Sequence, residues 1–306
     1  MKHTRRHVYC IIAHTDPYCL ERLVALLDDE RNDICLVIDK KSELRKRALP
    51  QTKFSRLYTP KAEQLVDIRW GGVSQLRAEL LAFSTALEHG QYDYFHLISG
   101  QDLPLKSQDY VHNFFDALPH DSNCISIEFG DNIDKIHAFN CGYYHLFTNK
   151  TRCHNVYVRK ICSLIRRAFI RIQKISGYQR DWSGYVLGKG TNWASLSYPF
   201  VNYLVTNRDF VIKRFTGVLG PDEIYKHTLL LSSKYKDTIM SFLEISNSLR
   251  HIDWNRGLPY VWRKNDFKEL KDCNELFARK FNSAIDKEII DSIYTMLKGH
   301  EYEAKS

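Results

Sequence analysis

One stretch constrains the fold of this chain more than any other: an apolar run that stops at a glycine and is followed by polar residues. The run Tyr94–Ser99 has the length and apolar character of a buried strand, and Gly100 ends it. Gln101 and Asp102 come next, so an amide and a carboxylate stand directly after the strand. In open α/β sheets, ligands bind at the carboxyl ends of the strands. The segment therefore predicts both a buried strand and a binding site at its end.

The first half of the chain alternates strand-like and helix-like segments. Apolar runs predict strands at 8–13, 34–38 and 56–58, and apolar residues at helical spacing predict helices at 18–27 and 75–88. Strands that alternate with helices form parallel or mostly parallel sheets with right-handed crossovers. We therefore expect an α/β fold in which helices flank a mostly parallel central sheet.

The pattern is looser in the second half. Strands are expected at 124–129, 193–196 and 251–254, and a helix is expected to run from Pro221 to about Leu231. No internal repeat, low-complexity tract or linker interrupts the chain. These observations favour one continuous globular unit.

The formal net charge of +8 points to nucleic acid, an anionic membrane or a phosphorylated ligand as a partner. No helix-turn-helix, zinc-finger or RNP motif is present, so no nucleic-acid partner is expected. The segment 156–175 predicts a basic amphipathic helix. Its apolar side could pack on the core beneath a solvated face, or the helix could dock on an anionic membrane or partner.

The sequence shows neither a signal-peptide core nor an apolar run of the roughly 20 residues that span a bilayer. We therefore expect a cytoplasmic location. If 156–175 docks on lipid, the protein would lie peripherally on the inner face of the membrane.

Several catalytic motifs are absent. No GxGxxG follows the first strand, and no P-loop or Gly-x-Ser-x-Gly elbow is present. No Asp-x-Asp occurs either. In many nucleotide-sugar transferases that pair of carboxylates binds Mg²⁺ or Mn²⁺ and bridges it to the diphosphate. The sequence therefore predicts no metal site.

Polar residues at strand ends are the candidate ligands. His14 and Asp39 follow the first two predicted strands, where a carboxylate can accept from a ribose hydroxyl. Asp39 could equally cap a turn, and a lone His is often structural. Trp70 beside Gly71 offers an aromatic face next to flexible backbone, or ordinary packing.

Two further segments carry charge. In Pro221-Asp222-Glu223 a proline suited to a helix start places two carboxylates in the first turn, where the macrodipole stabilises them. Simple helix capping is the alternative. Arg279 and Lys280 lie between aromatic residues, and partly desolvated cations act strongly on a phosphate. An ordinary surface pair is the alternative there.

Taken together, seven segments resemble the core-2/I-branching β-1,6-N-acetylglucosaminyltransferase family, which also contains the peptide O-xylosyltransferases. In chain order these segments are 11–14, 37–41, 70–74, 94–105, 221–223, 251–254 and 277–281. They run in this order over nearly the whole chain. The resemblance implies a GT-A-like nucleotide-sugar transferase fold. It also implies a single domain, 1–306, with a nucleotide-binding half at 1–107 and an acceptor and catalytic half at 108–306.

The resemblance further implies an inverting transfer from a UDP-sugar that needs neither a metal nor another cofactor. Glu223 matches the general base, which would deprotonate the acceptor hydroxyl that attacks the anomeric carbon. Lys280 matches the phosphate-binding lysine, which would stabilise the UDP leaving group. Its basic partner stays open between three residues, namely Arg250, Arg256 and Arg279.

His14 and Asp39 match nucleotide-binding positions, and 190–193 matches a glycine-rich aromatic segment near the sugar and acceptor. The residues expected in the donor and acceptor pocket are Trp70, Gly71, Gln101, Asp102, Trp193, Asp222, Asp253 and Trp254. Asp102 is interpreted as an organiser of this pocket.

The expected reaction moves GlcNAc to a glycan or lipid-linked glycan acceptor in cell-surface polysaccharide synthesis. A xylosyltransferase or another UDP-hexose transferase is the alternative. A glycan- or membrane-binding module without turnover is a non-enzymatic alternative, which the joint presence of Glu223 and Lys280 disfavours.

Overall fold

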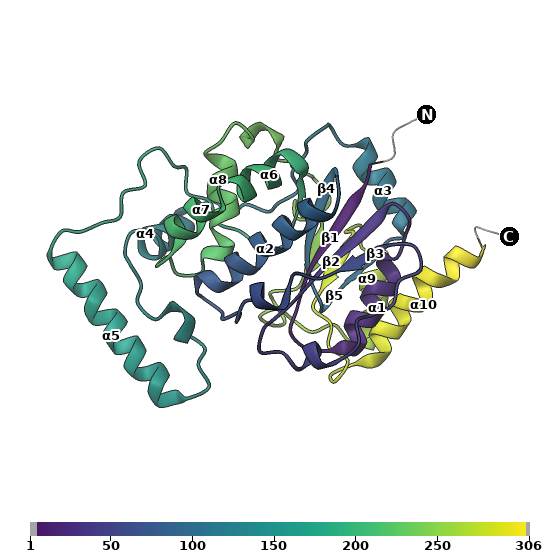
Figure 1. Cartoon of the computed structure of the whole chain (residues 1–306), viewed down its shortest axis with the longest axis horizontal. Coiled ribbons are helices and arrows are strands. Elements are labelled where there is room, and N and C mark those ends of the chain that lie inside the picture. The colour runs from purple at the N-terminus through teal and green to yellow at the C-terminus, as the bar shows by residue number, and fades with distance from the viewer. Residues whose placement is uncertain (1–4, 304–306) are drawn as a thin grey trace.

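The protein is described by a computed structural model that covers residues 5–303, and its centre is a five-stranded sheet with the order β3-β2-β1-β4-β6 (Figure 1). The strands are β1 (His7–Ala13), β2 (Asn32–Ile38), β3 (Arg56–Tyr58), β4 (Tyr94–Ser99) and β6 (Ala194–Ser197). The first four are parallel, and β6 runs antiparallel to β4. The prediction of a mostly parallel central sheet is confirmed.

Strand β1 is buried on both faces, which explains its unbroken apolar sequence. Tyr9 and Ile11 point into one hydrophobic cluster, with helices α1 (Pro17–Leu27) and α10 (Lys287–Glu303). Val8 and Cys10 point into a second cluster, with α2 (Val73–His89), α6 (Tyr198–Thr206), α7 (Arg208–Phe215) and α8 (Tyr225–Leu231). Successive side chains of a strand point to opposite faces, so one strand supplies both clusters. The result is a three-layer α/β fold.

A second sheet, which the sequence did not predict, brings the C-terminal motif to the end of β4. Its strands have the order β5 (Asp102–Pro104), β8 (Phe277–Arg279) and β7 (Arg250–Ile252). Asp102 pairs with Arg279 across the antiparallel β5–β8 ladder. The polar residues after β4 and the basic residues of 279–280 therefore meet at one place.

Two expected elements differ in the structure. The segment 124–129 forms no strand and makes only isolated bridges, between Cys124 and Ser195 and between Glu128 and Lys189. The helix expected from Pro221 is interrupted: Pro221–Glu223 is a 3₁₀ turn, and α8 begins after Ile224. Glu223 therefore does not lie in the first turn of an α-helix, and the predicted stabilisation of its carboxylate by a helix macrodipole is wrong.

Helix α5 (Val156–Ile175) has the predicted bounds but lies at the far end of the molecule from the sheet (Figure 1). Only Ile170 and Gln173 of this helix are buried. The interpretation of a core-packed helix is therefore wrong.

The other α-helices of the described chain are α3 (Gln108–Ala117), α4 (Asp131–Asn140) and α9 (Phe267–Asp272). Within residues 5–303, no helix combines the length and the apolar composition that crossing a bilayer requires.

Candidate active site

A cavity of about 700 Å³ opens at the carboxyl ends of β1, β2 and β4. Ile12, His14, Asp39 and Ser99 line it from these strand ends. The sheet order reverses here, because the chain moves outward from β1 through β2 to β3 and then returns to place β4 on the other side of β1. Ligands of open α/β sheets bind at such switch points, and pockets for small molecules measure about 300–1,000 Å³.

The nucleotide-binding candidates His14 and Asp39 both face this cavity. Burial and, after it, the Lys280 ammonium lower the pKa of His14, so its ring is neutral at pH 7 and can both donate and accept. Asp39 is fixed in place because its Oδ1 accepts from the backbone amides of Lys41 and Ile68, each at 3.2 Å. Its Oδ2 lies 3.4 Å from the Lys41 Nζ.

Cations from the C-terminal motif form a second wall of the cavity. Arg279 donates to Asp102 Oδ1 at 2.6 Å, and its guanidinium lies 4.5 Å from the centre of the Trp193 ring. Lys280 also lines the cavity. Burial, followed by the nearby Arg279, lowers its pKa. Within the described residues the Lys280 ammonium has no hydrogen-bond partner, so it is available to an anionic ligand.

A third cation on the cavity, Arg152, was not predicted from the sequence. Its guanidinium stacks 3.8 Å from the centre of the Trp70 ring, and both side chains line the cavity. Thr151 donates to the Trp70 carbonyl, and a Cβ added at Gly71 would lie 2.8 Å from Thr151 Oγ1. Gly71 therefore packs against Thr151 and does not line the cavity. No local pattern around Arg152 marks it, because its partner lies far away in the chain.

The carboxylate of Glu223 lies on the same cavity, paired with a lysine that the sequence analysis also missed. Lys189 Nζ lies 3.3 Å from Glu223 and 3.4 Å from Glu128. Burial alone would lower the pKa of Lys189, but the two carboxylates outweigh it and raise the pKa. The amide of Gly190 also donates to the Glu223 carbonyl at 3.0 Å. Glu223 is thus held in position at the cavity, with its side chain 39% exposed. The glycines on either side of Lys189 were the only available signal for it.

Beneath Glu223 lies a fully buried ion pair. Lys226 Nζ donates to Glu79 at 2.6 Å, to Asn192 at 2.5 Å and to the Asp222 carbonyl at 2.9 Å. The side chains of Lys226 and Glu79 have no exposed surface. Because Asn192 and Asp222 line the cavity, this buried pair anchors its floor.

Asp222 itself is a buried carboxyl group on the cavity. Burial raises its pKa to about 7, and the carboxylates of Glu79 and Glu223 add to the effect. Between pH 4 and 7 the unfolded chain has released this proton while the folded chain still holds it, so stability falls as pH rises through that window and stays reduced above it.

We therefore expect Asp222→Asn to be more stable than wild type above pH 7 and similar to it near pH 4. The gap between the ordinary 3.8 and about 7 corresponds to on the order of 4 kcal/mol at most. Urea unfolding of both proteins at pH 4, 6 and 8 measures this difference. A stability difference that stays constant over this range would contradict it.

Of the three arginines considered as the basic partner of Lys280, only one lines the cavity. Arg279 lines the cavity, whereas Arg250 is buried between the sheets, where it donates to the carbonyls of Leu97 and Ala194. Arg256 pairs with Asp253, Asp266 and Glu269 on the surface. The structure therefore does not bring Arg250 or Arg256 to Lys280, because each is already occupied elsewhere.

Of the residues expected in the donor and acceptor pocket, half line the cavity and half do not. Trp70, Trp193, Asp222 and Trp254 line the cavity. Besides Gly71, three other candidates do not line it. Gln101 is buried and donates to the Phe281 carbonyl, Asp102 is buried beneath Arg279, and Asp253 accepts from Asn255 and Arg256. Asp102 acts on the cavity only through Arg279. Among the side chains that the structure describes, those of residues 5–299, no three His, Cys, Asp or Glu are grouped as metal ligands would be.

The model of the family described as "Core-2/I-Branching enzyme" matches residues 8–281. The chain belongs to the core-2/I-branching enzyme family. Beta-glucuronosyltransferase GlcAT14B of Arabidopsis thaliana is 26% identical over 67% of this chain and 44% of its own length. Human xylosyltransferase 2 is 25% identical over 92% of this chain and 32% of its own length, and rat xylosyltransferase 1 is 24% identical over 92% and 34%. The chain thus spans only 32% to 44% of the length of these relatives.

Membership of the core-2/I-branching family confirms the resemblance seen in the seven motifs, the GT-A-like fold and the prediction of an enzyme. Among solved structures, apo mouse xyloside xylosyltransferase 1 aligns with 89% of this chain and 96% of its own. Its TM-score is 0.36 and its identity is 10%, a similarity too low to relate individual residues.

Proposed function

We propose that this protein is an inverting glycosyltransferase that moves a sugar from a UDP-sugar to a hydroxyl group of a glycan acceptor. One observation carries the proposal. A single cavity at the switch point of the sheet holds a positioned carboxylate, Glu223, together with a set of cations, Arg152, Arg279 and Lys280. Transfer from a nucleoside diphosphate needs a base for the acceptor and positive charge for the leaving group.

Glu223 is the proposed general base. It removes the proton from the acceptor hydroxyl as the oxygen attacks the anomeric carbon, and the bond to the UDP oxygen breaks on the opposite side. The ion pair with Lys189 fixes the carboxylate before the acceptor arrives. Positioning of this kind contributes to rate because a base must lie within hydrogen-bond reach of the proton that it takes.

Lys280 is the proposed counter-charge for the departing UDP. Its ammonium has no hydrogen-bond partner within the described residues, and Arg279 beside it is oriented by Asp102. Fixed cations in a partly buried site stabilise developing charge strongly. We therefore propose that the reaction needs no divalent metal.

The donor is proposed to be UDP-GlcNAc. Xylose and glucuronic acid are the alternatives, since relatives carry the names xylosyltransferase and beta-glucuronosyltransferase. A panel of UDP-GlcNAc, UDP-xylose, UDP-glucuronic acid and UDP-glucose, each with and without excess EDTA, tests donor and metal together. We expect UDP release from UDP-GlcNAc at a rate that EDTA leaves unchanged.

The outcomes of this panel separate the competing functions. Release only from another donor would reassign the sugar. Complete loss of release in EDTA would contradict the role given to Lys280. No release from any donor, with no thermal shift on adding UDP, would indicate a binding module, because a ligand that binds the folded state must stabilise it.

A further inference from the structure

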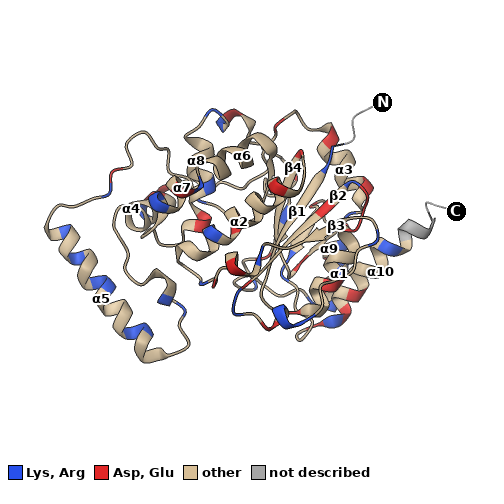
Figure 2. Ribbon diagram, viewed as in Figure 1, with Lys and Arg blue, Asp and Glu red and all other residues tan. Residues whose placement is uncertain are grey.

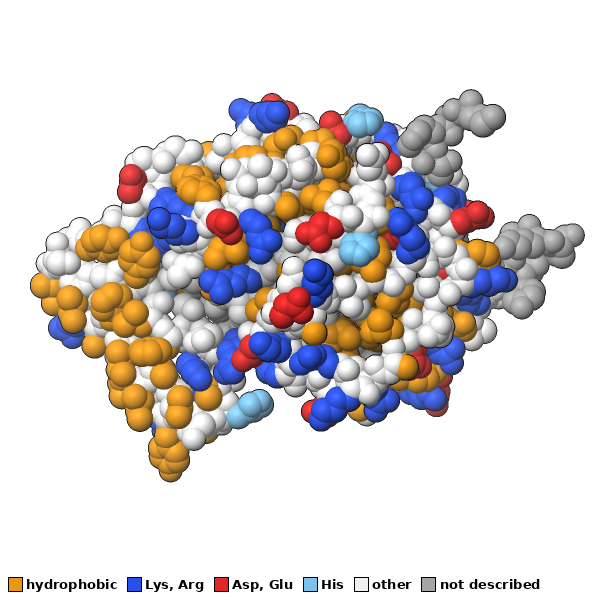
Figure 3. Space-filling view, in the orientation of Figure 1, with side chains coloured by type: hydrophobic (Ala, Val, Ile, Leu, Met, Phe, Trp, Pro, Cys, Tyr) orange, Lys and Arg blue, Asp and Glu red, His pale blue; other side chains and the backbone are white. Residues whose placement is uncertain are grey.

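Helix α5 exposes a row of large apolar side chains that no other part of the described chain covers. Figure 3 shows these orange side chains along the outer edge of the molecule. The residues are Tyr157, Val158, Ile161, Leu164, Ile165, Ile172 and Ile175. Tyr157 and Ile175 are nearly four-fifths exposed, at 79% and 78%. Soluble proteins rarely leave a contiguous apolar surface of this kind without a partner.

The spacing places these residues on one face of the helix. Tyr157, Ile161, Leu164, Ile172 and Ile175 recur at intervals of three, four or eight residues, which return to the same side of an α-helix. Lys160, Arg167, Arg171 and Lys174 follow the same rhythm on the adjoining side, and all four are exposed. The helix therefore presents an apolar face bordered by a row of cations.

The charge around α5 has only one sign. No Asp or Glu occurs between Asp134 and Asp181, and Figure 2 shows only Lys and Arg on this helix. Six cations, Arg159, Lys160, Arg166, Arg167, Arg171 and Lys174, belong to the helix itself, against a formal net charge of +8 for the whole chain. A face that is both apolar and flanked by cations is complementary to anionic lipid headgroups above acyl chains.

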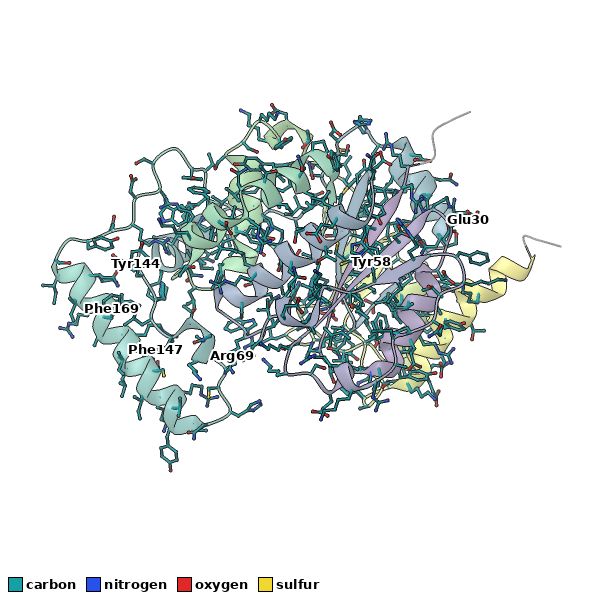
Figure 4. The ribbon with its side chains drawn as sticks, viewed as in Figure 1. Glu30, Tyr58, Arg69, Tyr144, Phe147 and Phe169 are labelled. Carbon is teal, nitrogen blue, oxygen red and sulfur yellow. The ribbon has the colours of Figure 1, made fainter. Side chains whose placement is uncertain are left out.

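The side of α5 opposite to the apolar face contacts the rest of the protein. Gln173 exchanges hydrogen bonds with the backbone N–H and carbonyl of Tyr144, both at 2.9 Å, and Ile170 is buried. Figure 4 shows Tyr144 close to the part of α5 that carries Phe169. The contacts that fix the helix leave its apolar face directed outward.

We propose that α5 is an interfacial anchor that lays its outer apolar face into an anionic membrane surface. The cations at its border then lie at the level of the headgroups. Val156, the first residue of α5, follows Arg152 in the cavity wall by four residues, which span at most about 14 Å. A lipid-linked acceptor held by the same membrane would thus be within reach of the cavity. This last step rests on the proposed function, whereas the membrane contact does not.

Vesicle flotation with the full chain tests the contact. We expect binding to vesicles of phosphatidylglycerol and phosphatidylcholine at low salt, weakening as salt is added, and little binding to phosphatidylcholine alone. Ile161→Ser with Ile172→Ser should abolish binding. Arg167→Gln with Arg171→Gln should weaken it by about fivefold for each cation removed.

A matched control removes exposed apolar side chains elsewhere. Phe54 and Leu243 lie outside α5 and are 53% and 103% exposed, so Phe54→Ser with Leu243→Ser should bind vesicles as wild type does. Circular dichroism of each variant verifies that the fold is retained.

Three results would overturn the proposal. The first is no flotation of the wild-type protein with anionic vesicles at low salt. The second is an equal loss of vesicle binding in the α5 variants and in the Phe54→Ser, Leu243→Ser control. The third is a concentration-dependent dimer that is lost in the Ile161→Ser, Ile172→Ser variant, while neither wild type nor any variant binds vesicles. UDP release without vesicles is measured separately, so a failure of the glycosyltransferase proposal stays distinguishable from a failure of the anchor.

Discussion

Replacing Glu223 with Gln is expected to lower the rate of sugar transfer by about 10²–10⁴-fold, the usual contribution of a general base, while UDP binding stays near that of wild type. The amide keeps the size and hydrogen-bonding reach of the carboxylate but cannot take up the acceptor proton. The rate is measured as UDP release in the presence of acceptor, and UDP binding is measured by calorimetry. Loss of UDP binding in this variant would reassign Glu223 to the nucleotide.

Glu128→Gln is the matched control for this experiment. Glu128 also pairs with Lys189, at 3.4 Å, so its replacement removes a comparable charge from the same lysine without removing the proposed base. Its side chain is 44% exposed, and a pair this exposed contributes about 1 kcal/mol or less. We expect at most a severalfold loss. Equal losses in both variants would mean that the local charge, and not proton transfer at Glu223, governs the rate.

The residues at strand ends could be predicted from the sequence because strand endings are local signals. An unbroken apolar run followed by a polar residue marks the carboxyl end of a buried strand, and this placed His14 and Asp39 on the cavity. The wall formed by Arg279 and Lys280 needed more than such signals. It depends on the pairing of β5 with β8, whose residues lie far apart in the chain. The family resemblance supplied Lys280, but no local pattern predicted the second sheet.

The residues missed or misplaced share a physical cause. Arg152 and Lys189 reach the cavity through contacts with Trp70 and Glu223, which lie distant in the sequence. Arg250 looked like a phosphate ligand, but its neighbours in space are the carbonyls between the two sheets. For α5, periodicity identified an apolar face correctly but could not say whether protein covers it. In each case the missing information is which distant surface meets the residue.

Replacing Lys226 with Met is expected to destabilise the fold by about 3–5 kcal/mol, the cost of leaving one partner of a buried ion pair alone. Glu79 Oε2 now accepts from the Lys226 Nζ at 2.6 Å and from the Tyr225 hydroxyl at 2.8 Å, so this variant would leave it only the hydrogen bond from Tyr225. Methionine matches the lysine stem in length, so packing changes little. Urea unfolding at pH 8 measures the loss.

The pH dependence of this loss identifies the buried charge as its cause. In wild type, burial raises the pKa of Glu79 and the Lys226 ammonium opposes that effect. Without the ammonium, the folded protein holds the Glu79 proton to still higher pH, while the unfolded chain releases it above about pH 4. The deficit of Lys226→Met should therefore grow between pH 5 and pH 8. The double variant Glu79→Gln with Lys226→Met removes both charges and keeps an acceptor for Tyr225, so it should recover much of the stability and lose the pH dependence. A deficit that is equal at both pH values, and unchanged in the double variant, would mean that altered packing beneath the cavity and not the unpaired carboxylate destabilises the protein.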